Sequence, residues 1–399
     1  MVQCPDRIIA SMDTGVDDAL ALAYLLGSAD ECELGGVIAG YGNVDANTAY
    51  ANTCAVLDLF GRADIPVFLG SEHPSWADAF IPDAGCAQFH GDDGLGNTRL
   101  AGSGALADGA GVPGDDMSGD DMSGDDMSVD VPDEVVSVGG YLAGDVHAHP
   151  ALGACSRVNR SRSVGHPQST MPTALASGGK RRCSVDAADG IEYLIEQVRE
   201  FGRDVTVLAT GPLTDVDAAI ASKLRLVMMG GTLTQPGNCW DAVAETNIIQ
   251  DPEAANRVFH SGADITMVGL DVTHQCLLPQ SAADRWRATG TKRGRFLADL
   301  ADFSIKANLE ADPALFSGGM PLHDPLAAAV ALDSSLVDCF DLALRAETNT
   351  GDFNGVRGRT TGDPVGLVNH SMPHVHVALG VDSERFLDEF VERMAEVCR

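Results

Sequence analysis

Residues 7–18 read Arg7-Ile8-Ile9-Ala10-Ser11-Met12-Asp13-Thr14-Gly15-Val16-Asp17-Asp18, and the apolar run 19–26 follows. The pattern predicts a short buried strand, a turn, and a helix opened by Asp17 and Asp18. Open α/β sheets bind their ligands at such turns. Asp13, Asp17 and Asp18 would repel one another there, and a divalent cation with oxygen ligands would explain why three carboxylates lie together. Asp17 and Asp18 could instead be first-turn acids that complement the helix dipole. The third carboxylate, Asp13, favours the interpretation as a cation site.

The composition is that of a large and strongly acidic protein. The chain has 399 residues, a formal net charge of −32 and only four lysines. This charge argues against nucleic acid as a partner, because a phosphate backbone would be repelled. Arginine supplies nearly all the positive charge and aspartate outnumbers glutamate, which resembles proteins of salt-saturated cytoplasms. We therefore expect a halophilic, archaeal source.

Neither a membrane span nor a secretory signal is evident along the chain. No stretch of about 18 uninterrupted apolar residues occurs, and the N-terminus lacks the basic-then-apolar pattern of a signal peptide. The ten cysteines are spread singly without a CxxC pair, as expected for reduced core residues. We expect a soluble cytoplasmic protein without a membrane partner.

Strand-like apolar runs recur along the chain, and each ends in a polar or glycine-containing turn. These runs cover residues 35–40, 65–69, 205–209, 226–229 and 265–270, and helical patterns cover 47–60, 190–201, 252–260 and 325–332. Such alternation predicts one α/β domain over residues 1–399, with an open, mostly parallel sheet flanked by helices. The polar turns should gather at one edge of this sheet.

The alternation of strand-like and helical patterns stops over residues 101–185, which we interpret as a low-complexity insertion. The sequence Gly114-Asp115-Asp116-Met117-Ser118 occurs three times in tandem up to Ser128. A basic stretch between residues 157 and 182 follows among serines and prolines. Such segments cannot bury a core, so the insertion is expected to be a disordered loop. The alternative is a loose fold-back driven by its opposite charges.

Six segments taken together resemble the nucleoside hydrolases of the inosine-uridine preferring type. They are 13–22, Gly42-Asn43, His90-Gly91-Asp92-Asp93-Gly94-Leu95-Gly96, Thr210-Gly211-Pro212-Leu213-Thr214, Met229-Gly230-Gly231 with Gly237-Asn238 and Ala244-Glu245-Thr246-Asn247, and Leu322-His323-Asp324-Pro325. Each motif alone is weak, but all six occur in the expected order. The resemblance spans the chain except for the insertion and implies a Rossmann-like nucleoside hydrolase fold.

The resemblance implies hydrolysis of the N-glycosidic bond of ribonucleosides to free nucleobase and ribose, with one Ca²⁺ as cofactor. The residues that match the family's metal ligands are Asp13, Asp18 and Asp324, through their carboxylates, and Thr210, through its main-chain carbonyl. Oxygen-only ligation suits calcium. Asp13 would also be the general base that takes a proton from the attacking water.

The same resemblance assigns the substrate contacts. Asp17 and Asn43 would bind the ribose 2′- and 3′-hydroxyls, and Asn238, Glu245 and Asn247 would hold the 5′ side. Hydrogen bonds of this kind to the sugar can use binding energy to distort it towards a flattened cation. Asn43 and Asn238 could alternatively be turn residues that follow glycine.

Two histidines are assigned to the nucleobase side of the site. His323 stands beside Asp324 and matches the family's general acid, while His90 is expected to line the pocket. A lone histidine is often a hydrogen-bonded structural residue, but the motif and the neighbouring Asp324 favour catalysis for His323. The preferred nucleobase is not evident from the sequence, and the resemblance implies a homodimer or homotetramer.

Ser11 is the main departure from the family signature, which commonly has aspartate at this position. A supporting aspartate could be replaced by serine at the expense of weaker calcium binding. The departure leaves open a catalytically silent, calcium-dependent nucleoside-binding protein. A phosphatase of the haloacid dehalogenase type, which also begins with a strand and a DxD turn, would need a nucleophilic aspartate where Ser11 stands, and this argues against it.

Overall fold

The computed structural model describes residues 6–82, 84–98, 100, 183–184, 186–220, 224–239, 242–349, 355–364 and 371–399. The acidic repeat and the basic stretch of the insertion lie outside the described residues. Within the predicted insertion the structure describes Cys183–Ser184, which forms the short strand β4. This strand pairs with β3, so the sheet resumes before residue 185.

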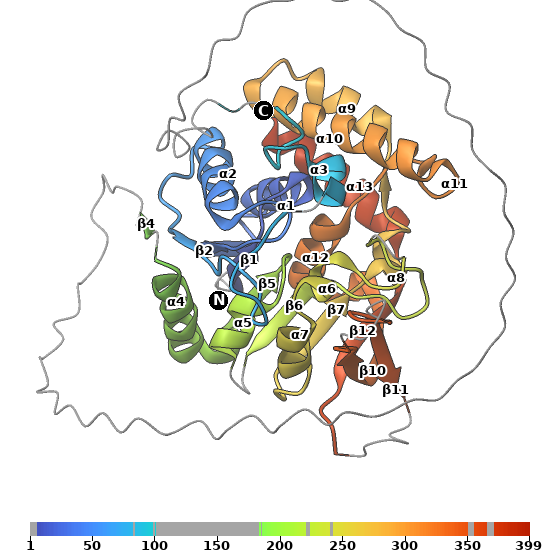
Figure 1. Ribbon diagram of the computed structural model, residues 1–399. Helices are drawn as coiled ribbons and strands as arrows, with labels where there is room; N and C mark the ends of the chain where they lie inside the picture. The colour runs from blue at the N-terminus through green and yellow to red at the C-terminus, as the bar shows by residue number, and fades with distance from the viewer. Residues whose placement is uncertain are drawn as a thin grey trace, which may run out of the picture. The chain divides into compact units, whose positions relative to one another are not determined.

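A ten-stranded sheet runs through the described part of the chain (Figure 1). Its strands, in spatial order, are β11 (Thr360–Asp363), β10 (Val337–Ala346), β12 (Val375–Val381), β7 (Asp264–Val268), β6 (Arg225–Met229), β5 (Val205–Ala209), β1 (Asp6–Met12), β2 (Cys32–Ala39), β3 (Val67–Leu69) and β4 (Cys183–Ser184). All neighbours from β12 to β4 are parallel, and β10 is antiparallel to both β11 and β12. The predicted α/β class with a mostly parallel sheet is confirmed.

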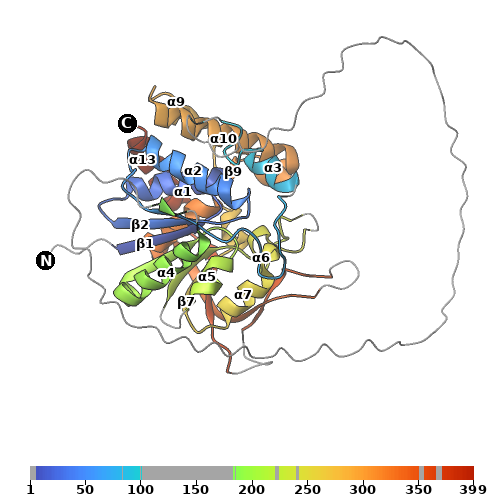
Figure 2. The ribbon, with the colours of Figure 1, turned by 60° about the vertical axis from the view of Figure 1, so that its left-hand side comes forward.

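Helices cover both faces of the sheet (Figure 2). One face carries α1 (Val16–Gly27), α2 (Ala46–Leu59), α9 (Gln280–Arg287), α10 (Lys292–Ala311), α12 (His323–Leu332) and α13 (Ser383–Val397). The other carries α4 (Ala187–Phe201), α5 (Thr214–Ala219) and α7 (Pro252–Phe259). Shorter helices α3 (Ala84–His90), α6 (Thr246–Gln250), α8 (Leu270–Thr273) and α11 (Pro313–Phe316), together with the two-stranded sheet of β8 (Leu277–Leu278) and β9 (Met320–Pro321), complete the described elements near the site.

The central strand β1 explains why the helices stack on both faces. Ile8 and Ala10 pack into the core beneath α1, whereas Ile9 packs into the core on the side of α4. A strand buried on both faces reads as a continuous apolar run because both side-chain directions need apolar contacts. The run 7–12 therefore predicts β1 correctly.

β1 is also the point where the strand order reverses. The chain runs from β1 to β2, β3 and β4 in one direction and then returns to β5 on the other side of β1. The loops that leave β1 and its neighbours consequently diverge and form a crevice at their carboxyl ends, which is the usual ligand site of such sheets. Asp13 lies at this crevice.

The carboxyl-terminal part of the sheet differs from the sequence-based expectation. No strand was predicted after residue 270, yet β10 and β12 form an antiparallel pair beside β7. The predicted strand 265–270 ends at Val268, and α8 begins at Leu270. The long helix α10 was also not predicted. Four consecutive residues of β10, from Asp338 to Asp341, are exposed, so its sequence lacks the alternation that identifies strands.

Candidate active site

The opening aspartates occupy the turn between β1 and α1. Asp13 follows β1 directly, and Asp17 and Asp18 lie in the first turn of α1, with all three carboxyl groups buried. The backbone N–H of Gly15 donates to Asp18 Oδ2 at 2.8 Å, which caps the helix. This is the role of a first-turn acid, and Asp18 combines it with a place in the site.

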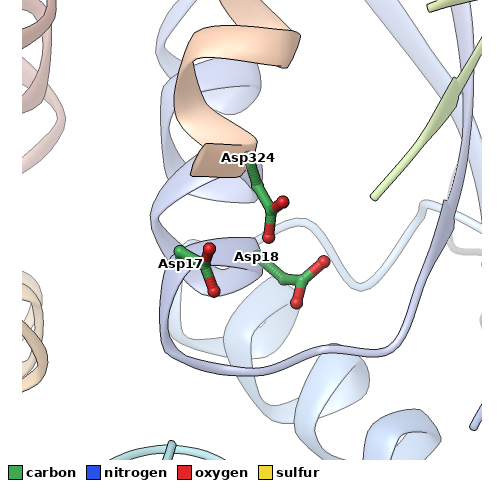
Figure 3. A group of neighbouring side chains, drawn as sticks. All are labelled: Asp17, Asp18 and Asp324. Atoms are coloured by element: carbon green, nitrogen blue, oxygen red, sulfur yellow. The ribbon is translucent and has the colours of Figure 1, made fainter. Parts of the chain in front are cut away.

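Asp324 brings a further carboxylate to this turn from α12. Carboxylate oxygens of Asp17, Asp18 and Asp324 lie within 4.8 Å of one another, and Figure 3 shows the Asp324 side chain extending from α12 towards the first turn of α1. Among the described residues, Asp17 Oδ1 is buried and has no hydrogen-bond partner. An unsatisfied buried carboxylate oxygen costs free energy unless something binds it. We call these three residues the acidic cluster.

The pKa values of the acidic cluster follow from burial and mutual repulsion. Burial, followed by the charge of Asp17, raises the pKa of Asp18 to about 6 and raises the pKa of Asp324 well above its ordinary value. Burial likewise raises the pKa of Asp17. A divalent cation would remove both causes, because it replaces the lost hydration and neutralises the negative charge. The oxygen donor set therefore fits a hard cation such as calcium.

Asp13 lies beside the acidic cluster and is held by Asn43. The backbone N–H of Asn43 donates to Asp13 Oδ2 at 2.7 Å, and its side-chain amide donates to Asp13 Oδ1 at 3.1 Å and to Asp18 Oδ2 at 3.3 Å. Gly42 approaches Asp13 so closely that a Cβ atom there would collide with the carboxylate. Asn43 therefore fixes the orientation of the predicted base, in addition to its predicted contact with ribose.

Thr210, at the end of β5, connects three parts of the site. Its hydroxyl donates to Asp18 Oδ1 at 2.6 Å, and its backbone N–H donates to the carbonyl of Ser11 at 2.9 Å. Its carbonyl, the predicted metal ligand, accepts a hydrogen bond of 2.9 Å from the side-chain amide of Asn247. A carbonyl oxygen has a second lone pair, so this bond leaves one acceptor position for a cation.

Glu245 and Asn247 hold the loop that follows β6. Glu245 is the N-cap of α6, and its carboxylate accepts backbone N–H groups of Gly231, Asn247 and Ile248 at 2.9–3.1 Å. The Asn238 side-chain carbonyl accepts from Thr246 N at 3.0 Å. Because these bonds join Glu245 to the backbone, its carboxylate can act on a substrate mainly through its buried negative charge. The side-chain amide group of Asn238 and the side-chain carbonyl of Asn247 remain able to hydrogen-bond to a substrate.

His90 is the last residue of α3 and faces the start of α1. The backbone N–H of Val16 donates to His90 Nδ1 at 3.2 Å, so the neutral ring carries its proton on Nε2. Burial lowers the pKa of His90 to about 4. The adjacent glycine turn is fixed by Asn52 of α2, whose amide donates to the carbonyls of Thr14 and Asp93 at 3.2 and 2.8 Å. Asn52 thus joins the loop of Asp13 to the loop after His90.

One cavity of about 560 Å³ collects the predicted site residues. Its lining includes Asp17, Asn43, His90, Thr210, Asn238, Glu245, Asn247, His323 and Asp324. Asp13 and Asp18 lie buried behind this lining, in contact with Asn43. The volume is typical of a pocket for a small molecule. Residues from six separate stretches of sequence therefore meet at one place, as the motifs predict.

The cavity also has a wall that the sequence analysis missed. It is formed by Phe89 of α3, His274 after α8, Ser304 and Asn308 of α10, and Phe316 of α11, with Met320 of β9 beside them. The His274 ring contacts those of His323 and Phe316, with centroids 5.6 and 5.5 Å away. The signal available in the sequence was the group of polar residues Asp271, Thr273 and His274 after β7, in the position of the other site turns.

A sequence model of the inosine-uridine preferring nucleoside hydrolase family matches residues 8–388. The chain belongs to this family. It is therefore an enzyme of the nucleoside hydrolase class, as the six motifs predict. A pyrimidine-specific ribonucleoside hydrolase RihA of an Enterobacter species is 29% identical over 98% of this chain and 97% of its own.

Solved structures agree with this assignment. A purine-preferring ribonucleoside hydrolase from Gardnerella vaginalis is 33% identical and has a TM-score of 0.72, covering 98% of this chain and 99% of its own. A plant nucleoside hydrolase is 25% identical with a TM-score of 0.70 over the same shares of both chains. The RihA relative is named as pyrimidine-specific and the Gardnerella enzyme as purine-preferring, so these similarities leave the base preference of this chain open. No helix of the described residues is long and apolar enough to cross a membrane.

Proposed function

We propose that this nucleoside hydrolase cleaves the N-glycosidic bond of ribonucleosides with one Ca²⁺ bound by Asp13, Asp18, Asp324 and the main-chain carbonyl of Thr210. The observation that carries the proposal is the acidic cluster at the cavity, in which Asp17 Oδ1 has no hydrogen-bond partner among the described residues. When bound, the cation would supply Lewis acidity and charge neutralisation. Since Asp17 lies in the acidic cluster, it can reach both the cation and the ribose hydroxyls.

Asp13 is the proposed general base. Both of its oxygens are oriented by Asn43, and Asp18 lies beside it. A base held in one orientation can take a proton from a water molecule on the adjacent face of the sugar. Asn43 keeps its side-chain carbonyl for a ribose hydroxyl, because its amide group is committed to the carboxylates.

The ribose would lie between the acidic cluster and Glu245, with the nucleobase directed towards His323. Asp17 and Glu245 favour positive charge that develops on the ring as the bond breaks. Asn238 and Asn247 line the cavity near Glu245 and would hold the 5′ side. His323 and His90 line the same cavity, and we propose His323 as the general acid towards the leaving base and His90 as a further wall residue.

The silent-binder alternative is less well supported than hydrolysis. The chain has the buried carboxyl groups of Asp13 and the acidic cluster and the imidazole of His323 that hydrolysis would use, and Ser11 is buried near the end of β1, where its carbonyl accepts from Thr210 N. Ser11 therefore still supports the site through its backbone. A phosphatase would need a nucleophilic carboxylate at position 11, where the chain has Ser11.

The test is to incubate the purified chain with inosine, uridine, cytidine and adenosine in multimolar KCl with CaCl₂ and to assay released ribose. We expect hydrolysis of at least one nucleoside, abolished in Asp13→Asn and retained in Asp388→Asn, which removes an exposed acid on α13. His323→Ala should slow substrates with poor leaving bases most. If all four nucleosides stay intact while calorimetry shows calcium and nucleoside binding, the chain is a binding protein.

The remaining assignments are proposals with separate tests. The net charge of −32 supports a cytoplasmic enzyme of a halophile, so activity and stability should both rise from dilute buffer to multimolar KCl. A homodimer or homotetramer is proposed from the family resemblance. Light scattering coupled to size-exclusion chromatography in high salt measures the mass directly, and a 41.6 kDa species would reject oligomerisation.

A further inference from the structure

Thr273, the last residue of α8, contacts the imidazole of His323. Its Oγ1 lies 2.8 Å from His323 Nδ1. Thr273 is 0% exposed, whereas His323 lines the cavity. Nδ1 is therefore engaged by the protein interior, and Nε2 is the ring nitrogen that remains for a molecule in the cavity.

The position of the imidazole proton follows from the partners of the Thr273 hydroxyl. Among the described residues, Nδ1 of His323 is the one hydrogen-bond partner of this hydroxyl. If Nδ1 carried the proton and donated it to Oγ1, the hydroxyl proton would be buried without an acceptor, at a cost of about 1–3 kcal/mol. If the hydroxyl donates to Nδ1 instead, both groups are satisfied and the ring proton is on Nε2.

His274, the next residue, fixes the ring plane. Its imidazole packs edge-on against His323, with centroids 5.6 Å apart, and Phe316 packs edge-on against His274. Two consecutive residues thus hold His323, one through a hydrogen bond and one through ring packing. This double support restricts rotation of the ring, which would otherwise exchange its two nitrogens.

We propose that Thr273 is a positioning residue of the hydrolysis, whose hydroxyl donates to Nδ1 of His323 and so presents Nε2–H to the leaving nucleobase. The inference rests on the proposed function, since it uses His323 as the group that assists the leaving base. It also narrows the general-acid role proposed above: His323 acts as a neutral imidazole whose Nε2–H hydrogen-bonds to the base as negative charge develops on it, without full transfer of that proton. Neutral histidine serves as such an electrophile in other enzymes.

The kinetic test compares Thr273→Val, which keeps the shape and removes the hydroxyl, with Thr273→Ser, which keeps the hydroxyl. Thr206→Val, at a buried threonine of β5, is the matched control. We expect kcat for a ribonucleoside to fall at least about tenfold in Thr273→Val with KM little changed, and Thr273→Ser and Thr206→Val to stay near wild type. Turnover of p-nitrophenyl β-D-ribofuranoside should change much less, because nitrophenolate leaves without help.

An independent test reads the tautomer directly. Selective ¹⁵N labelling of the eleven histidines, with His323→Gln to assign the signal, shows by NMR which ring nitrogen of His323 carries the proton. Protonated Nε2 in the calcium-loaded chain supports the inference, and protonated Nδ1 overturns it. Nucleoside turnover in Thr273→Val equal to wild type also overturns it. If wild type hydrolysed no nucleoside, the proposed function would fail, and the NMR result would still decide the tautomer.

Discussion

Calcium should stabilise the folded protein, because it would offset the repulsion within the acidic cluster. Two unit negative charges 4.8 Å apart repel by about 3.5 kcal/mol at an effective dielectric constant of 20. Three ionised carboxylates at that spacing would cost roughly 10 kcal/mol, comparable with the whole stability of a typical domain. We therefore expect the carboxyl groups of the metal-free protein to hold their protons to higher pH than free carboxyl groups, in the direction of their raised pKa values.

The assay is thermal unfolding of the full chain in multimolar KCl, with EDTA or with CaCl₂ at about one hundred times the dissociation constant. Mass action then gives about 2.7 kcal/mol of added stability, provided that the unfolded chain does not bind calcium. At roughly 2 °C per kcal/mol for a large domain, the midpoint should rise by about 5 °C. MgCl₂ should give a smaller rise, because magnesium demands tighter octahedral geometry.

Two variants make this prediction specific. Asp324→Asn should abolish most of the calcium-dependent rise and should itself unfold at a higher temperature than wild type in EDTA, because one repelling charge is gone. Asp388→Asn, on the exposed surface of α13, should keep the full rise. Equal midpoints in EDTA and CaCl₂, or a full calcium response in Asp324→Asn, would refute the reasoning.

Three further predictions concern the scaffold. Phe390→Ala should lower the free energy of unfolding in urea by about 3–5 kcal/mol, because Phe390 is fully buried against Tyr24, Trp286 and Phe386; a loss below 1 kcal/mol would contradict this packing. Asn52→Ala should cost about 1–3 kcal/mol and also lower kcat/KM, because it frees both site loops at once; unchanged kinetics would separate Asn52 from the site. Burial raises the pKa of Asp215, so this side chain holds its proton to higher pH in the folded protein than in the unfolded chain. Its contribution to the free energy of unfolding therefore falls as pH rises above the unfolded pKa. The stability of Asp215→Asn relative to wild type should accordingly increase as pH rises above the unfolded pKa, and a difference that shrinks with pH would contradict this prediction.

The elements at the centre of the sheet could be predicted from the sequence because burial controls their composition. β1 and β5 are buried along almost their whole length, and the runs 7–12 and 205–209 match them to within one residue. Asp13 and Thr210 then directly follow these two strands, at the positions where the sequence predicts polar turns. At these positions local pattern and tertiary environment impose the same requirement.

The edge of the sheet and one wall of the cavity could not be predicted, because neither depends on a local pattern. β10 alternates poorly, since one stretch is exposed and its stability comes from pairing with β12. Thr273 and His274 act on His323, 50 residues away in the chain. A contact of this separation leaves no periodic signal in either segment, and it becomes visible only when α8 and α12 are placed side by side.

The contacts of Thr210 indicate which positions around the cavity can be substituted without disturbing the site. Its amide, hydroxyl and carbonyl join β1, α1 and α6, so a replacement there would disturb three elements together. Part of the facing wall is formed by Phe89 of α3, Ser304 and Asn308 of α10 and Phe316 of α11, whose side chains make no hydrogen bond with β1, α1 or α6 among the described residues, whereas Thr273 and His274 at α8 hold His323. Mutations can accumulate at these positions of α3, α10 and α11 while the hydrolytic machinery keeps its geometry. The architecture thus separates an evolvable recognition half from a constrained catalytic half, and a search for variants with altered nucleobase preference can be confined to the former.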